Sequence, residues 1–74
     1  MNRATKYVIF EIAIWIPKTK RTDYREYAVT VFDDPSGDKM ALDGAKAYAQ
    51  SCASRYGAGS TYTIKQIGLE EERP

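Results

Sequence analysis

The feature that most constrains the fold is a ten-residue segment, Tyr7–Ile16, in which Glu11 is the one charged residue. β-Branched and aromatic residues dominate it, and Pro17 follows directly. These residue types favour a β-strand, and proline ends a strand because it lacks a backbone N–H. Alternation along a strand places an entirely apolar set on one face: Val8, Phe10, Ile12, Ile14 and Ile16. We therefore predict a strand with this core face at the centre of a sheet.

Two further segments have strand character. Pro17–Thr22 is a polar connection of hairpin length, and it leads into a strand over Tyr24–Phe32. On this second strand we assign one face to the core: Tyr27, Val29 and Val31. A third strand is predicted over Thr61–Ile67, with two core residues: Tyr62 and Ile64. The three segments together indicate a small antiparallel sheet.

A helix is predicted between a turn at residues 33–38 and Gly57, since glycine commonly follows the last residue of a helix. Its start has two alternatives. Asp38 could cap a helix from Lys39, or Asp43 could cap a shorter one from Gly44, with residues 39–42 extended. The later start avoids a glycine inside the helix, which costs about 1 kcal/mol. We expect one stripe of the helix to face the sheet: Ala45, Ala49, Cys52 and Tyr56, with Tyr48 beside it.

The order of these segments is ββαβ, which predicts an α+β fold. The first two strands form a hairpin, the helix returns the chain across the sheet, and the third strand lies antiparallel beside the first. We expect a three-stranded antiparallel sheet of order 2-1-3 with the helix packed on one face. Residues 6–68 are predicted to form a single domain, and residues 1–5 and 69–74 to be loose tails.

Residue types exclude several chemistries. The chain has one cysteine, Cys52, and no histidine, so it offers neither an internal disulfide nor a zinc site of the Cys/His kind. The chain has no histidine to activate a serine or cysteine nucleophile, and we interpret Cys52 as a structural thiol of the helix. A calcium loop counted from Asp34 fails, because its sixth and twelfth positions are Lys39 and Ala45. We expect no metal, no cofactor and no enzymatic activity.

No segment has the roughly 20 consecutive apolar residues of a membrane-spanning helix, and residues 1–16 do not form a convincing signal peptide. We therefore expect no membrane partner. The free thiol fits a reducing compartment, so we expect a cytoplasmic protein.

The second face of the first strand is also mostly apolar, although a solvated face would alternate toward polar residues. With the helix on the other side, this open face gathers five large side chains: Tyr7, Ile9, Trp15, Tyr24 and Phe32. We expect a rim of polar residues around them: Glu11, Glu26, Thr30, Thr63 and Lys65. Aromatic residues inside a polar rim are typical of a protein interface. The prediction is a non-catalytic protein-binding domain that forms a homodimer or binds another protein through this face.

Nucleic-acid binding is the alternative function. Residues 1–25 carry a net charge of +4 and the remainder −3, so the first third of the chain is basic. Four of its cations lie in or beside the predicted hairpin connection: Lys18, Lys20, Arg21 and Arg25. Basic loops beside aromatic residues on a sheet are a common way to bind RNA or DNA. The same four residues could instead contact an acidic protein partner.

The layout of the chain resembles the small proteins of bacteriophages and mobile elements that include anti-CRISPR inhibitors. The resemblance lies in the turn Asp34-Pro35-Ser36-Gly37, the alanine-rich helix segment from Asp43 to Ala49, and the break at Gly57 and Gly59 before a terminal strand. It implies stoichiometric inhibition of a host protein complex without catalysis. It assigns no binding residues, because these proteins share no binding motif.

Overall fold

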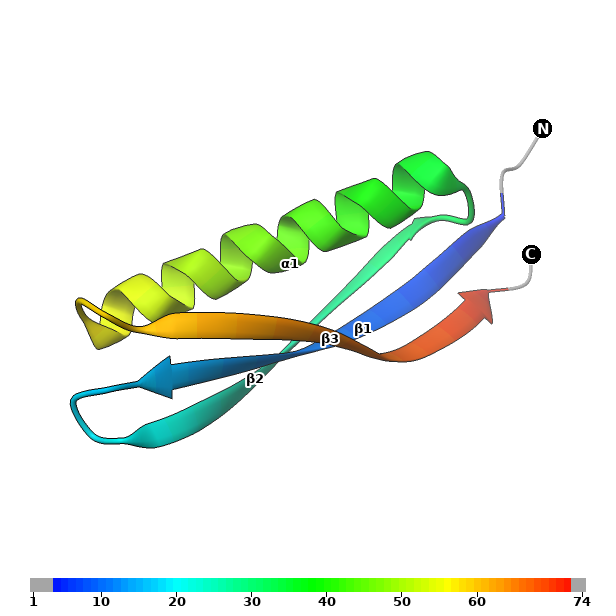
Figure 1. The fold of residues 1–74 in the computed structure, drawn as a ribbon. Helices are drawn as coiled ribbons and strands as arrows, with labels where there is room; N and C mark the ends of the chain where they lie inside the picture. Colours follow the sequence, from blue (N-terminus) through cyan, green and yellow to red (C-terminus); the bar gives the residue numbers. More distant parts are fainter. Residues whose placement is uncertain (1–3, 73–74) are drawn as a thin grey trace.

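The computed structural model describes the backbone of residues 4–72 and the side chains of residues 4–68. It contains the strand β1 (Thr5–Ile16), the strand β2 (Arg21–Phe32), the helix α1 (Pro35–Tyr56) and the strand β3 (Thr61–Glu72). The strands form an antiparallel sheet of order β2-β1-β3, and α1 covers one face of it (Figure 1). The predicted α+β class, the ββαβ order and the sheet topology are confirmed.

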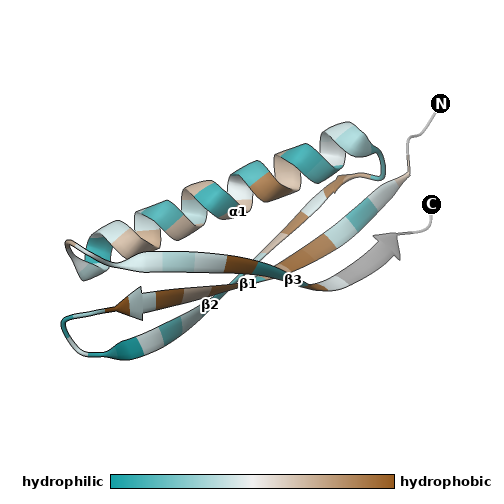
Figure 2. Cartoon of the chain, in the orientation of Figure 1, coloured by the Kyte–Doolittle hydropathy of each residue, from teal (hydrophilic) through white to brown (hydrophobic). Residues whose placement is uncertain are grey.

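The core lies between α1 and the middle of the sheet. β1 is hydrogen-bonded on both sides, and its predicted core face is buried along its full length, with Ile12 and Ile14 wholly inaccessible to solvent. Figure 2 shows the hydrophobic residues concentrated on this central strand. Tyr27, Val29 and Val31 of β2 and Tyr62 and Ile64 of β3 pack against the same core, as predicted.

The helix begins earlier than either predicted start. α1 starts at Pro35, and the Asp34 side chain caps it by accepting a hydrogen bond from the Gly37 backbone N–H at 2.8 Å. Proline suits the first helical position, because the N–H it lacks would have no helical partner there. Both predicted starts, at Lys39 and at Gly44, are therefore wrong: residues 39–42 are helical, and a glycine lies inside the helix.

The buried stripe of α1 consists of small residues spaced four apart. It runs through Gly37, Ala41, Ala45, Ala49 and Ala53. Ala45 and Ala49 belong to it as predicted, whereas Cys52 and Tyr56 lie at its edge and are half-buried. Because the stripe has no long side chains, the helix lies close to the sheet, and the sheet supplies the large side chains of the core.

β3 is longer than predicted. It continues through Glu72, so residues 69–72, predicted as part of a tail, pair with residues 5–8 of β1. Ile9 pairs with Gly68 while Phe10 pairs with Gln66, which leaves Ile67 as the extra residue of a β-bulge. Thr5 likewise opens β1 instead of belonging to a tail. The remaining residues of the two predicted tails, apart from Ala4, lie outside the described part of the chain.

Lys6 is a buried charged residue at the start of β1. Its ammonium forms ion pairs with Asp33, at 3.3 Å, and with Asp38 in the first turn of α1. The hydrogen bond to Asp38 raises the pKa of Lys6 above its usual value, against the opposing effect of desolvation. This cluster fastens the beginning of β1 to the beginning of α1.

Candidate functional site

Within residues 4–68, the face of the sheet opposite α1 carries no second layer (Figure 1). The odd-numbered side chains of β1 lie on it, because the even-numbered ones are buried beneath the helix. Directly paired residues share a face, so the register adds the even-numbered side chains of β2 and three exposed residues of β3: Thr61, Thr63 and Lys65. All five residues predicted for the interface lie on this open face: Tyr7, Ile9, Trp15, Tyr24 and Phe32.

The aromatic residues of the open face are exposed to different degrees. Tyr24 is 62% exposed, Trp15 43% and Phe32 42%, while Tyr7 and Ile9 are half-buried by their neighbours. Large apolar side chains left this accessible are typical of surfaces that bind another protein.

Charged residues cross the middle of the open face instead of only surrounding it. Glu11 on the central strand pairs with Glu26 of β2 on one side and with Lys65 of β3 on the other. The prediction of a polar rim is therefore wrong for Glu11, which lies on the central strand, whereas Glu26 and Lys65 lie on the outer strands. We call Glu26, Glu11 and Lys65 the central row.

The central row divides the open face into two apolar patches. Toward the β1–β2 turn, Tyr24 pairs with Ala13 and lies diagonally beside Trp15. Toward the other end, Ile9 pairs with Ala28, and Tyr7 and Phe32 lie beyond them. Outside the central row, the bulky side chains belong to β1 and β2, whereas residues 61–68 of β3 contribute threonines and Gly68.

The sheet separates the basic residues from the aromatic ones. Arg21 pairs with the buried Ile16 and Arg25 with the buried Ile12, so both arginines lie on the helix side of the sheet. Lys18 and Lys20 are exposed in the turn between β1 and β2. Trp15 and Tyr24 lie on the opposite face. The two arginines therefore do not share a face with the sheet aromatics, and nucleic-acid binding by the residue 18–25 hairpin stays a prediction.

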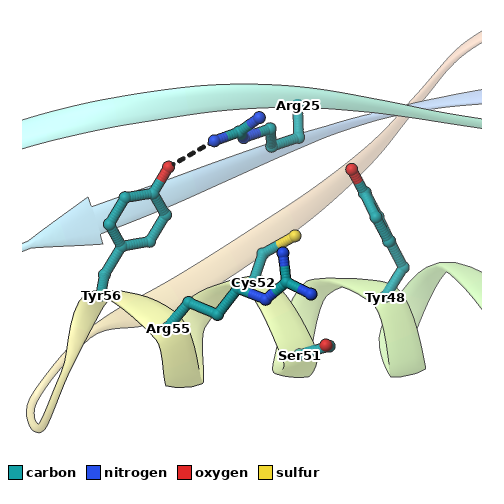
Figure 3. Close-up of a pocket in the computed structure, with 6 residues that line it drawn as sticks. All are labelled: Arg25, Tyr48, Ser51, Cys52, Arg55 and Tyr56. Atoms are coloured by element: carbon teal, nitrogen blue, oxygen red, sulfur yellow. Dashed lines mark hydrogen bonds between the residues drawn. The ribbon is translucent and has the colours of Figure 1, made fainter.

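Arg25 lines a groove between α1 and β2 (Figure 3). The groove has a volume of about 400 Å³. Figure 3 shows Arg25 extending from the strand on one side, and Tyr48, Cys52 and Arg55 rising from the helix on the other. We call this space the α1/β2 groove and define it by its six lining residues: Arg25, Tyr48, Ser51, Cys52, Arg55 and Tyr56.

A short hydrogen-bonded chain fixes one wall of the α1/β2 groove. The Tyr56 hydroxyl donates to an Asp23 carboxylate oxygen and accepts from Arg25 Nη2 at 2.7 Å. Arg25 Nη2 also lies 3.2 Å from the Asp23 carboxylate. The hydrogen bond from Tyr56 is the main cause that lowers the pKa of Asp23, and the contact with Tyr56 likewise raises the pKa of Arg25.

A second hollow of about 580 Å³ adjoins the α1/β2 groove and shares Arg55 and Tyr56 with it. Its other lining residues come from the end of β1, the turn and the start of β2: Ile16, Lys18, Thr19, Arg21, Thr22 and Asp23. Four cations thus border the two hollows, and one lining acid, Asp23, accompanies them. Lys18, Arg21 and Arg25 were predicted as a basic group, and the structure brings Arg55 to them.

The contribution of Arg55 is missing from the sequence-based prediction. Tyr48, Cys52 and Tyr56 are spaced four residues apart and Arg55 lies three residues after Cys52, so all four lie on one side of α1. This pattern could have placed Arg55 beside the cysteine. It could not have shown that this side of α1 lies over Arg25.

The described residues carry neither a candidate metal site nor a membrane-spanning helix. Among the described residues, no group of three or more His, Cys, Asp or Glu side chains could hold a metal ion. No helix in the described part of the chain is long and apolar enough to cross a membrane. Comparison with known proteins gives no match to a family model, to a curated protein or to a solved structure.

Proposed function

We propose that this chain is a non-catalytic protein-binding domain whose open face binds a second copy of the chain. The observation that carries the proposal is the asymmetry of that face across β1. The β2 side bears Tyr24, Phe32 and an acidic residue, whereas the β3 side, over residues 61–68, bears threonines, a glycine and a basic residue.

If the open faces of two copies stack on each other, a two-fold axis parallel to β1 can relate them. In this arrangement the two unequal sides of the face complement each other. The axis places β2 of one copy over β3 of its partner and keeps each row of paired residues in line. Tyr24 then lies over the small Thr63 of the partner copy, and Trp15 lies over its counterpart. In the central row, Glu26 of each copy faces Lys65 of the other, which gives two ion pairs.

The alternative two-fold arrangement, with the axis across the strands, is less favourable. It places β2 over β2, so that Glu26 faces Glu26 and Tyr24 faces the opposite end of the same strand. Like charges brought together in an interface cost several kcal/mol. With the axis along β1, Glu11 is the one residue of the central row that faces a like charge, namely Glu11 of the other copy.

The size of the open face is sufficient for a dimer. Three strands of about 40 Å, spaced about 4.8 Å apart, give a face of about 580 Å² per copy, and two such faces exceed the total of about 1,000 Å² that a specific interface needs. The strands of two aligned sheets cross at an angle of about 30°. One strand away from the axis, this angle shifts facing residues by less than the length of one residue along the strand. The rows around Glu11 therefore stay in contact.

Sedimentation velocity over a range of protein concentrations tests this proposal. We expect a concentration-dependent dimer that Trp15→Ala weakens at least tenfold and that Lys65→Glu or Glu26→Lys also weakens. The double variant Glu26→Lys/Lys65→Glu should recover dimerisation, because it exchanges the two charges of each ion pair. Lys46→Glu, on the exposed side of α1, is the matched control and should leave the equilibrium unchanged.

A chain that remains monomeric at millimolar concentration would overturn the dimer. So would a double variant that dimerises no better than the two single variants, because the sheets would then not meet with Glu26 over Lys65. Dimerisation that Trp15→Ala leaves intact would place the contact on another surface.

Two finer expectations stay predictions. The resemblance to phage-borne inhibitors predicts that the dimer, or the monomer it dissociates to, blocks a host protein complex. The cytoplasmic location follows from the free thiol alone. Nucleic-acid binding also stays a prediction, in which Lys18 and Lys20 of the turn would accompany the aromatic residues, because Arg21 and Arg25 lie on the other face of the sheet.

A further inference from the structure

We propose that the α1/β2 groove is a binding site for a small ligand that carries a phosphate monoester, with Arg25 and Arg55 holding the phosphate. The site lies on the helix side of the sheet, opposite the open face, so it does not depend on the proposed dimer.

The α1/β2 groove is lined by two basic residues. Arg25 and Arg55 come from different elements and line the same space, in which none of the six lining residues is acidic. Among residues 4–68, no carboxylate lies within ion-pair distance of Arg55. Arg25 is already paired with Asp23 at 3.2 Å, so Arg55 is the guanidinium of the groove that has no carboxylate partner among these residues. The groove therefore favours an anionic ligand.

The geometry of the cations favours phosphate over a single carboxylate. One guanidinium saturates the two coplanar oxygens of a carboxylate, whereas a phosphate monoester has three terminal oxygens arranged in three dimensions. Arg25 and Arg55 approach from opposite walls (Figure 3), so they suit an anion with oxygens on more than one side. Arginine is also the residue that binds phosphate with two parallel hydrogen bonds.

The groove is prepared for binding before a ligand enters. Tyr56 and Asp23 hold Arg25 in place through contacts of 2.7 and 3.2 Å. Tyr48 packs against Tyr27 with ring centroids 5.6 Å apart, which fixes the wall that faces Arg25. A site that is already ordered loses little conformational entropy on binding. The volume of about 400 Å³ is in the range of small-molecule sites, and the rings of Tyr48 and Tyr56 suit a planar group beside the phosphate.

Cys52 provides a direct test, because it lines the groove and is the chain's single cysteine. The rate at which a thiol reagent such as 5,5′-dithiobis(2-nitrobenzoic acid) modifies it should fall when a ligand occupies the groove. The probes are adenosine monophosphate and phenyl phosphate, with adenosine and phenol as their unphosphorylated counterparts. We expect saturable protection by both phosphates and none by the counterparts. Inorganic phosphate should compete with both.

Variants connect the protection to the arginines. Arg55→Gln should weaken the protection at least tenfold, and Arg25→Gln should do the same. Lys46→Gln removes a cation from another side of α1 and should change nothing. Circular dichroism shows whether each variant is folded, and Trp15→Ala should bind the probes normally whether or not the dimer forms.

Three outcomes would overturn the site. The first is the absence of protection by either phosphate at 10 mM. The second is equal protection by adenosine or phenol, which would show a purely apolar pocket. The third is protection by a twelve-nucleotide single-stranded DNA or by polyglutamate but not by the small phosphates, which would indicate a polyanion-binding surface instead.

Discussion

Gly44 is the residue whose substitution tests the packing of α1 on β2 most sharply. A glycine inside a helix normally costs about 1 kcal/mol relative to alanine, so Gly44→Ala would stabilise an isolated helix by that amount. In the folded chain, a Cβ on Gly44 would overlap the Tyr27 hydroxyl and lie 3.1 Å from Tyr27 Cζ. Tyr27 cannot turn aside freely, since its ring packs against Tyr48.

The magnitude follows from these two opposing effects. Overpacking by one methyl group costs about 1–3 kcal/mol, which outweighs the gain of about 1 kcal/mol in helix propensity. We therefore expect Gly44→Ala to destabilise the chain by about 1 kcal/mol. In a domain of this size that corresponds to a fall in Tm of about 4–8 °C.

Tyr27→Phe separates the two effects because it removes the atom nearest the new methyl group. In this background the overlap with the hydroxyl is absent, and Gly44→Ala should become neutral or stabilise by up to about 1 kcal/mol. The coupling between the two substitutions is then about 1–2 kcal/mol. Ala47→Gly, at an exposed position of α1, measures the helix-propensity contribution alone and serves as the calibration.

Urea unfolding followed by far-ultraviolet circular dichroism, at one protein concentration, gives the four free energies of the cycle. The reasoning is refuted if Gly44→Ala stabilises the original chain by the full amount that Ala47→Gly removes. It is equally refuted if the effect of Gly44→Ala is the same with tyrosine and with phenylalanine at position 27.

Two further substitutions test other contacts. Asp34→Ala removes the cap of α1 and should cost about 1 kcal/mol in urea unfolding, whereas an unchanged midpoint would show that the helix does not begin there. Asp23 has a lowered pKa in the folded chain, chiefly because Tyr56 donates to it. Its stabilising contribution is therefore complete above the ordinary aspartate pKa and is lost as the pH falls through the lowered value. Asp23→Asn should flatten this acid part of the stability curve, and an unaltered curve would contradict the assignment.

The fold was largely predictable because one strand dominates the sequence. The alternation through Val8, Ile12 and Ile16 determines which face of β1 meets the helix, and its apolar character on both sides predicts the central position. Once β1 is central, the chain order permits few arrangements of the other two strands.

The ends of the elements were less predictable, for identifiable reasons. Gly44 argued against a long helix, and only the position of the Tyr27 hydroxyl explains why a glycine lies there. The acidic residues 70–72 suggested a tail, and the bulge at Ile67 that carries β3 past Gly68 has no clear pattern in the sequence. In both places contacts between distant residues determine the local structure.

The candidate sites were likewise predictable from the sequence only in part. Alternation alone placed Trp15 and Tyr24 on one face, whereas the pairing of Glu11 with Glu26 and Lys65 needed the register of three strands. The α1/β2 groove depends on how the helix crosses the sheet. Periodicity within α1 does not give that crossing, so the meeting of Arg25 with Arg55 could be found only in three dimensions.

The position of β1 also affects how this chain is protected from aggregation. Its run of β-branched and aromatic residues is the kind of segment that assembles into fibrils when its backbone is free. In the folded chain β2 and β3 occupy both of its hydrogen-bonding edges over nearly its full length. The outer edges of the sheet belong instead to β2, which is rich in charged residues, and to β3, which is interrupted by its bulge. Fibril formation should therefore require β2 or β3 to detach from β1 first. The rate of fibril formation should then depend more on how often the sheet opens than on the concentration of folded protein.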